Sequence, residues 1–123
     1  MKEENDLKER TKQFALRIIR LFGNLPKTTE AQVLGKQLLR SGTSLGANYR
    51  EAHRGRSKAG FIAKCGDSLR ELEESACWLE LLVEGEIVAR TKLQPLRVEC
   101  DELTAIFVTI IKRAKEHENQ KSE

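Results

Sequence analysis

Long apolar runs are missing from this chain of 123 residues, and none approaches the roughly 20 residues that a membrane-spanning helix needs. The opening residues, 1–6, are mostly charged and lack the apolar core of a signal peptide. Aromatic residues make up only 5% of the chain, and the scarcity of β-branched runs argues against a sheet protein. We therefore expect a cytoplasmic, all-α protein with no membrane partner.

Cysteine and histidine are also scarce, which leaves little material for a metal or redox centre. Cys65, Cys77 and Cys100 show no C-x-x-C spacing and fall on or beside apolar positions, where reduced thiols pack as small hydrophobic groups. Neither His53 nor His117 stands three residues after a glutamate, as a ferritin-type di-iron bundle requires. The sequence therefore predicts no metal site, no cofactor and no catalytic residue.

Apolar residues recur at helical spacing through most of the chain. Glycine and proline separate four such stretches, which predict helices at residues 5–23, 29–54, 57–84 and 92–116. Short connections favour antiparallel neighbours, so we expect a single domain, residues 1–123, folded as an antiparallel up-down-up-down four-helix bundle. Residues 117–123 carry no apolar side chain, and this tail is expected to fray.

Two helix boundaries carry specific signals. Thr29 and Gln32 have the spacing of a capping box, which predicts the start of the second helix. Pro95 is expected in the first turn of the fourth helix, because proline lacks the N–H that later turns need.

The middle of the second predicted helix is unusual, because residues 41–48 are mostly small, poor helix formers. We expect the helix to continue, since Gly42 and Gly46 are four residues apart on one face, where a neighbouring helix can approach closely. A loop is the alternative. A phosphate-binding turn is a weaker one, because the G-x-x-x-x-G-K-[ST] spacing and a preceding strand are both missing.

Basic and acidic residues are separated along the chain, although the net charge is only +3. Between residues 36 and 64 the only carboxylate is Glu51, whereas residues 65–104 are mainly acidic. Cations gathered near a helix–helix turn can hold nucleic-acid phosphates through ionic contacts. We therefore predict an RNA- or DNA-binding face formed by Lys36, Arg40, Arg50, Arg54, Arg56 and Lys58. Alternatively the face contacts protein, since no aromatic residue interleaves with these cations to stack bases.

Glu71 and Glu74 lie one helical turn apart, a spacing at which two carboxylates can couple their protons as a catalytic pair. Such pairs more often lie on an exposed or salt-bridged helix face. We favour the salt-bridged interpretation, with Arg70 or a basic residue of the second helix as the partner.

Residues 38–52, with the Gly-Thr-Ser-x-Gly-Ala-Asn run at 42–48, resemble the bacterial four-helix-bundle proteins encoded by intervening sequences of 23S rRNA genes. Phe61, Glu71, Glu74 and residues 78–82 extend the likeness. The resemblance implies a small up-down bundle that assembles into a ring, expected to be a homopentamer, and no catalytic residue. More distantly, the chain is similar to the accessory variability proteins of diversity-generating retroelements, which are more basic and bind nucleic acid and a reverse transcriptase.

A ring would give the small and aromatic residues a role between subunits. We predict that the subunit interface includes Gly42, Gly46, Tyr49 and Trp78, with a basic face meeting an acidic face around the ring. In the alternative, the same residues lie inside the monomer, with Tyr49 and Trp78 as core aromatics. The expected function is that of a non-enzymatic oligomer that binds nucleic acid or another protein.

Overall fold

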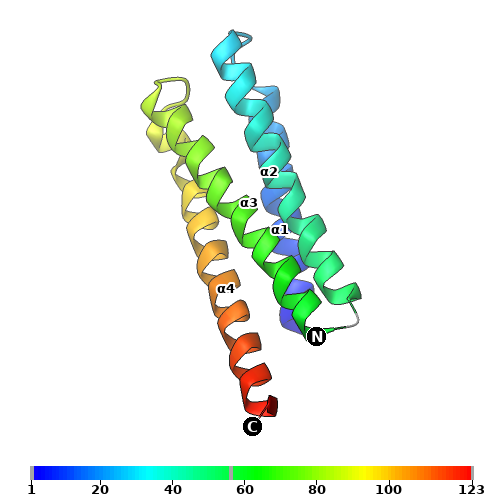
Figure 1. Ribbon diagram of the computed structural model, residues 1–123. Helices are drawn as coiled ribbons and strands as arrows, with labels where there is room; N and C mark the ends of the chain where they lie inside the picture. The colour runs from blue at the N-terminus through cyan, green and yellow to red at the C-terminus, as the bar shows by residue number, and fades with distance from the viewer. Residues whose placement is uncertain (1, 56, 123) are drawn as a thin grey trace.

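Four helices form the protein in a computed structural model that describes residues 2–55 and 57–122, with side chains as far as residue 117. They are α1 (Lys2–Gly23), α2 (Thr29–Arg54), α3 (Lys58–Glu84) and α4 (Arg90–Ser122). Figure 1 shows that consecutive helices run in opposite directions. The described residues include no strand, so the predicted all-α, four-helix class is confirmed. None of these helices is long and apolar enough to cross a bilayer.

Glycines on α2 bring it unusually close to α1. A Cβ added at Gly35 would lie 2.8 Å from Phe22 Cδ1, and one at Gly46 would lie 3.1 Å from Thr11 Oγ1. A Cβ at Gly42 would collide with Ile18 Cδ1. α2 is one continuous helix, as predicted. Its glycines leave room for α1 of the same chain.

This packing corrects two of the predicted interface residues. Gly42 is buried under Ile18, and Tyr49 is only 3% exposed, with its ring edge-on to Phe107 at a centroid distance of 5.4 Å. The surfaces of both residues are covered by contacts inside the chain, so neither is open to a neighbouring subunit. Gly46 is half-buried beside Thr11, and it too faces α1.

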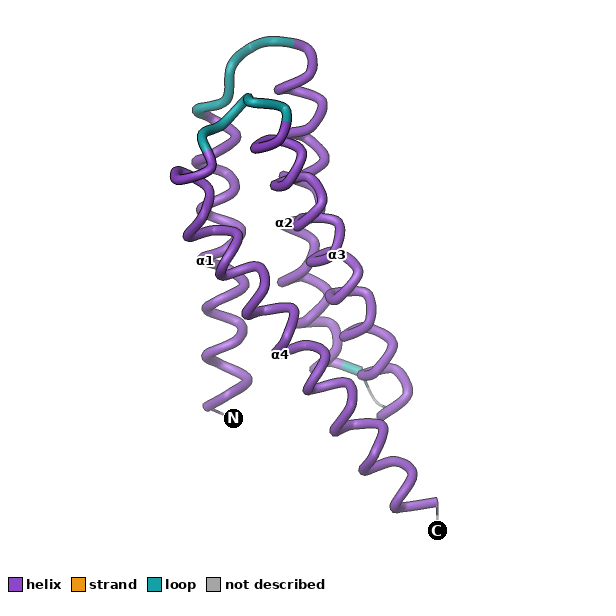
Figure 2. The backbone as a smooth tube through the Cα atoms, turned by 90° about the vertical axis from the view of Figure 1, so that its left-hand side faces the viewer, coloured by secondary structure: helices purple, strands orange, loops and turns teal. Residues whose placement is uncertain are grey.

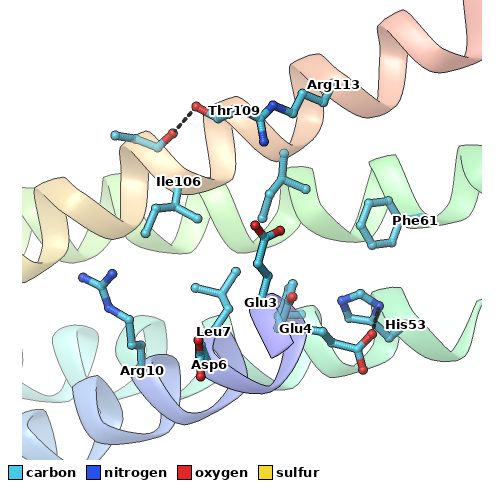
Figure 3. Close-up of a pocket in the computed structure, with 13 residues that line it drawn as sticks. Glu3, Glu4, Asp6, Leu7, Arg10, His53, Phe61, Ile106, Thr109 and Arg113 are labelled. Atoms are coloured by element: carbon cyan, nitrogen blue, oxygen red, sulfur yellow. Dashed lines mark hydrogen bonds and ion pairs between the residues drawn. The ribbon is translucent and has the colours of Figure 1, made fainter. Parts of the chain in front are cut away.

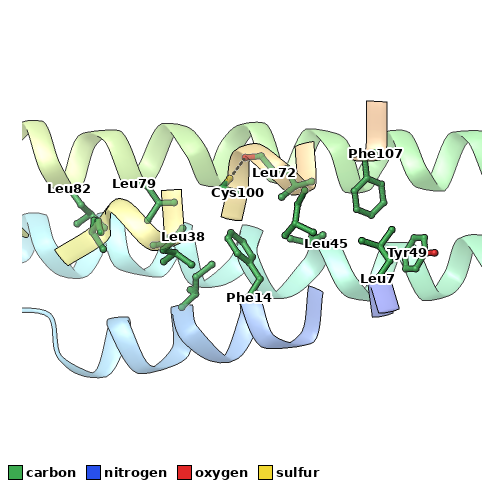
Figure 4. Packing of buried hydrophobic residues seen from close by; sticks show 14 of the residues in the cluster. Leu7, Phe14, Leu38, Leu45, Tyr49, Leu72, Leu79, Leu82, Cys100 and Phe107 are labelled. Carbon is green, nitrogen blue, oxygen red and sulfur yellow. Dashed lines mark hydrogen bonds between the residues drawn. The ribbon is translucent and has the colours of Figure 1, made fainter. Parts of the chain in front are cut away.

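Buried serines join α2 to α3, the two helices with the most extensive contact. Ser41 Oγ and Ser75 Oγ share a hydrogen bond of 2.8 Å, and Ser68 Oγ donates to the Leu45 carbonyl at 2.9 Å. All three serines are fully buried, and their hydroxyls cost little there because each has a partner. Figure 4 shows Leu38, Leu45, Leu72 and Phe107 in the apolar core.

The ends of the helices differ in detail from the predicted signals. The N-cap of α2 is Thr28, one residue before the predicted Thr29, and its hydroxyl accepts from the Ala31 N–H at 3.4 Å. Gln32 donates to the Pro26 carbonyl at 2.9 Å rather than closing a capping box. α4 begins at Arg90, which places Pro95 in its second turn. The predicted tail, 117–123, is helical to Ser122, and residue 123 lies outside the described residues.

The bundle is closed more tightly on one side than on the other. α1 and α4 meet least among the neighbouring helices, and Figure 2 shows them diverging toward the end where α1 begins and α4 finishes. Where they are close, Arg10 on α1 donates to Glu99 on α4 at 2.6 Å and to Glu102 at 3.2 Å. This ion-pair group is the main polar link between the first and last helices.

Two glycines in equivalent helical backbone should respond oppositely to a side chain. Gly42→Leu should lower the free energy of unfolding by about 1–3 kcal/mol, because the added carbons must displace the fully buried Ile18. A Cβ at Gly66 on α3 would meet no atom within 4 Å, so Gly66→Ala should raise the free energy of unfolding by up to about 1 kcal/mol. Urea denaturation measures both. Equal midpoints for the two variants would contradict the close approach of α1 at Gly42.

The three free thiols should differ sharply in reactivity. Burial raises the pKa of Cys65 to about 11 and that of Cys100 to about 12, whereas Cys77 is exposed on α3. Because the thiolate is the reacting species, an aromatic disulfide reagent at mildly alkaline pH should modify one thiol of the native protein quickly and the other two only after unfolding. Cys77→Ser should abolish the fast phase. A persistent fast phase in that variant would show that the core opens at Cys65 or Cys100.

Candidate nucleic-acid interface

An exposed stripe runs along α2, between the edges where this helix meets α1 and α3. It contains Lys36, Arg40, Arg50 and Arg54, with the small residues Thr43 and Ala47 between them, and all six are exposed. Their spacing alternates between four and three residues, which keeps them on one side of a helix. At about 1.5 Å of rise per residue, the stripe is roughly 27 Å long.

Arg40, in the middle of the stripe, forms ion pairs with carboxylates of α3. Its guanidinium lies 2.5 Å from Glu74 Oε1 and 3.4 Å from Glu71 Oε2. The carboxylate pair is thus salt-bridged, as favoured from the sequence, and its partner comes from the second helix. Part of the predicted match between a basic and an acidic face is therefore made within one chain, because α2 and α3 are adjacent.

Arg50, Arg54 and Lys58 form the open part of the predicted face. All three are exposed, and none has an ion-pair partner among the residues that the structure describes. They lie at the end of α2 and the start of α3, around the turn that also contains Arg56. Arg56 itself lies outside the described residues. Lys36 stands apart at the far end of the stripe, so the six predicted residues do not form one patch.

Lys12 on α1 joins this open part, although no pattern in the sequence indicates it. Lys12, Ala15, Gly46, Ala47 and Arg50 line a shallow depression of about 220 Å³ between α1 and α2. Only the register of α1 against Gly46 places Lys12 there, and that register is a tertiary property. Glu9 moderates the charge, because its carboxylate lies 3.7 Å from the Lys12 ammonium.

Nearby cations on α3 contribute less. Lys64 lies 2.8 Å from Glu51 Oε2, and the hydrogen bond between them raises the pKa of the Lys64 ammonium and lowers the pKa of the Glu51 carboxyl. Both groups therefore stay charged and largely neutralise each other. The net positive region is confined to Arg50, Arg54 and Lys58, with Lys12 at its edge.

Trp78 is half-buried on α3 and packs against the core, while keeping part of its ring exposed. Its indole Nε1 is buried and has no hydrogen-bond acceptor among the described residues. Unlike Gly42 and Tyr49, Trp78 still has surface available to another molecule, and its predicted interface role stays a prediction. No group of three or more potential metal ligands occurs within residues 2–55 and 57–117.

The chain is similar to known proteins in both sequence and structure. A family model described as 23S rRNA-intervening sequence protein matches residues 3–109. Among solved structures, a protein of unknown function from the S23 ribosomal protein family of Bacteroides thetaiotaomicron is 38% identical, with a TM-score of 0.83, and the match covers 89% of this chain and 97% of that one. No curated protein sequence matches significantly. These findings confirm the family resemblance that residues 38–52 predicted.

Proposed function

Because the chain belongs to the 23S rRNA-intervening sequence protein family, we propose that it is a non-enzymatic, oligomeric module that binds nucleic acid. The observation that supports this ligand best is the exposed cluster of Arg50, Arg54 and Lys58, which has no ion-pair partner among the described residues. Two arginines one helical turn apart, next to a lysine, are spaced to contact successive phosphates. The binding is ionic and reads no base sequence.

The geometry also limits how much of the predicted face takes part. Arg40 must break two ion pairs to reach a phosphate, and Lys36 is roughly 21 Å along the helix from Arg50 at about 1.5 Å per residue. A single strand bound around the α2–α3 turn therefore contacts Arg50, Arg54 and Lys58 first. Lys12 on α1 widens this site toward the first helix.

Self-association is the second part of the proposal, and a homopentameric ring is the assembly that the family resemblance implies. Exposed apolar side chains support it, because Val98 and Val108 on α4 are 42% and 49% exposed and Leu81 on α3 is 42% exposed. These residues suit the apolar centre of a subunit contact. If no nucleic acid binds, these exposed apolar residues favour the alternative, a module that contacts another protein.

Nucleic-acid binding should depend steeply on salt and on two arginines. Fluorescence anisotropy with a labelled single-stranded RNA, read over a salt series, gives the slope of the logarithm of the binding constant against the logarithm of the salt concentration. Arg50→Ala/Arg54→Ala should make this slope shallower by about 1.4, the value for two lost phosphate contacts. The control Lys92→Ala/Lys112→Ala removes the same charge from exposed positions on α4 and should leave the slope unchanged. Absence of binding at low salt, or equal effects of the two double variants, would refute the assignment.

The assembly should be visible as a solution mass well above 14.0 kDa, near five chains by light scattering. Val98→Lys/Val108→Lys should lower this mass, because two charges at the centre of a subunit contact lose their hydration without gaining partners. Circular dichroism checks that the variant remains folded. A parent protein of one-chain mass would remove the ring, while the salt experiment would still decide nucleic-acid binding.

A further inference from the structure

A groove of about 640 Å³ lies between α1 and α4, where these helices diverge. Its floor is apolar and includes Leu7, Tyr49, Phe61 and Ile110, so all four helices contribute. Figure 3 shows Arg113 of α4 across from Glu3 of α1, with His53 and Phe61 at the same end. Sites for small molecules typically have volumes of about 300–1,000 Å³, an apolar lining and a few convergent polar groups. The groove has all three properties.

His53 supplies a hydrogen-bond acceptor in this groove that nothing in the described chain uses. Its Nδ1 lies 2.9 Å from Glu4 Oε1, and since a carboxylate only accepts, Nδ1 carries the proton. Burial lowers the pKa of His53, against the opposing charge of Glu4, so the ring is neutral and its Nε2 holds a lone pair. Nε2 is buried without a partner among the described residues, so a ligand reaches it only when the side chains around the ring shift. A buried acceptor of this kind favours a ligand that brings an N–H or O–H donor.

The charges around the groove favour a cation over an anion. Glu3, Glu4 and Asp6 line it from α1, against Arg10 and Arg113. Arg10 is already neutralised by Glu99 and Glu102, which leaves Arg113 as the one lining arginine free of an ion pair within residues 2–55 and 57–117. Glu4 is shared between His53 and Lys8, whose ammonium lies 2.9 Å away. The net charge that the lining residues present to a ligand is therefore negative.

Aromatic rings add a second preference of the same sign. The ring centroid of His53 lies 4.7 Å from that of Tyr49 and 5.3 Å from that of Phe61, so a donor that reaches His53 Nε2 comes close to two aromatic rings. Aromatic faces attract ammonium ions. The wall opposite, made by Ile106 and Ile110 of α4, is aliphatic and suits a hydrocarbon chain.

We propose that the α1–α4 groove binds a small organic ammonium ion with an apolar body. The ammonium group donates to His53 Nε2 within reach of the carboxylates of α1, and the hydrocarbon part lies along Leu7, Ile106 and Ile110. This site is separate from the nucleic-acid face on α2, and its ligand belongs to a different chemical class. A test of this site therefore does not decide the proposed function, and a test of the proposed function does not decide this site.

Three probes of one chain length test the charge preference. Titration calorimetry with octylammonium, octanoate and 1-octanol should show saturable binding of octylammonium, about tenfold or more tighter than that of octanoate, a ratio equivalent to about 1.4 kcal/mol. Octanol should fall between them. Octanoate that binds as tightly as octylammonium, or octylammonium that does not saturate, would overturn the proposal.

Two variants locate the binding in the groove. Ala105 lines it and is exposed, so Ala105→Trp should fill the groove without disturbing the core and abolish octylammonium binding. Gln94→Trp adds the same ring at an exposed position of α4 that does not line the groove, and should bind as the parent does. His53→Phe keeps an aromatic ring but removes Nε2, and should weaken binding about tenfold or more, the loss expected for one hydrogen bond to a charged group.

The remaining outcomes also decide the matter. Equal binding by Ala105→Trp and Gln94→Trp would place the probe elsewhere and overturn the site. If His53→Phe does not fold, the tryptophan pair still gives the answer. If Ala105→Trp reduces the solution mass and the parent does not bind octylammonium, the groove is a contact between copies of this chain, and the ligand proposal is wrong.

Discussion

Small side chains on α2 control how the bundle is built. Where α2 faces α1, glycines remove the Cβ atoms that would otherwise hold the helices apart, and where it faces α3, serines of both helices replace larger side chains and form short hydrogen bonds. Close backbone approach increases dispersion contacts along the whole length of a helix pair. Helix propensity is sacrificed for this, since glycine and serine are poor helix formers. Packing thus overrides local preference in the most unusual stretch of the sequence.

The location of the basic stripe follows from the same arrangement. With α1 on one side of α2 and α3 on another, only a narrow strip of α2 remains in contact with water. Cations are well tolerated on such a strip because their charged ends stay hydrated. Glu71 and Glu74 of α3 form ion pairs with Arg40, which lies opposite them. Arg50 and Arg54 have no ion-pair partner among the described residues. Neighbouring helices therefore select which cations are available for a ligand.

Periodicity was sufficient to predict the helices, since α2 and the end of α3 match their expected bounds and the apolar stripes became the core. It could not predict which face of α2 met which neighbour, so Gly42 and Tyr49 were assigned to a subunit interface although they are buried inside the chain. Lys12 and the partner of Arg40 depend on helix register, and the α1–α4 groove depends on a divergence between helices far apart in sequence. A single chain's pattern contains none of this geometry.

Unequal contact between the helices also has a consequence for how the protein opens. The Arg10–Glu99 ion pair links α1 to α4 at an edge with little apolar contact, whereas α2 and α3 share a continuous buried surface. Local opening should therefore begin at this edge, with the first turns of α1 separating from the far half of α4 while the α2–α3 hairpin persists. Amide hydrogens of α1 and of the end of α4 would exchange with solvent through this partial opening, and those of the hairpin only through global unfolding.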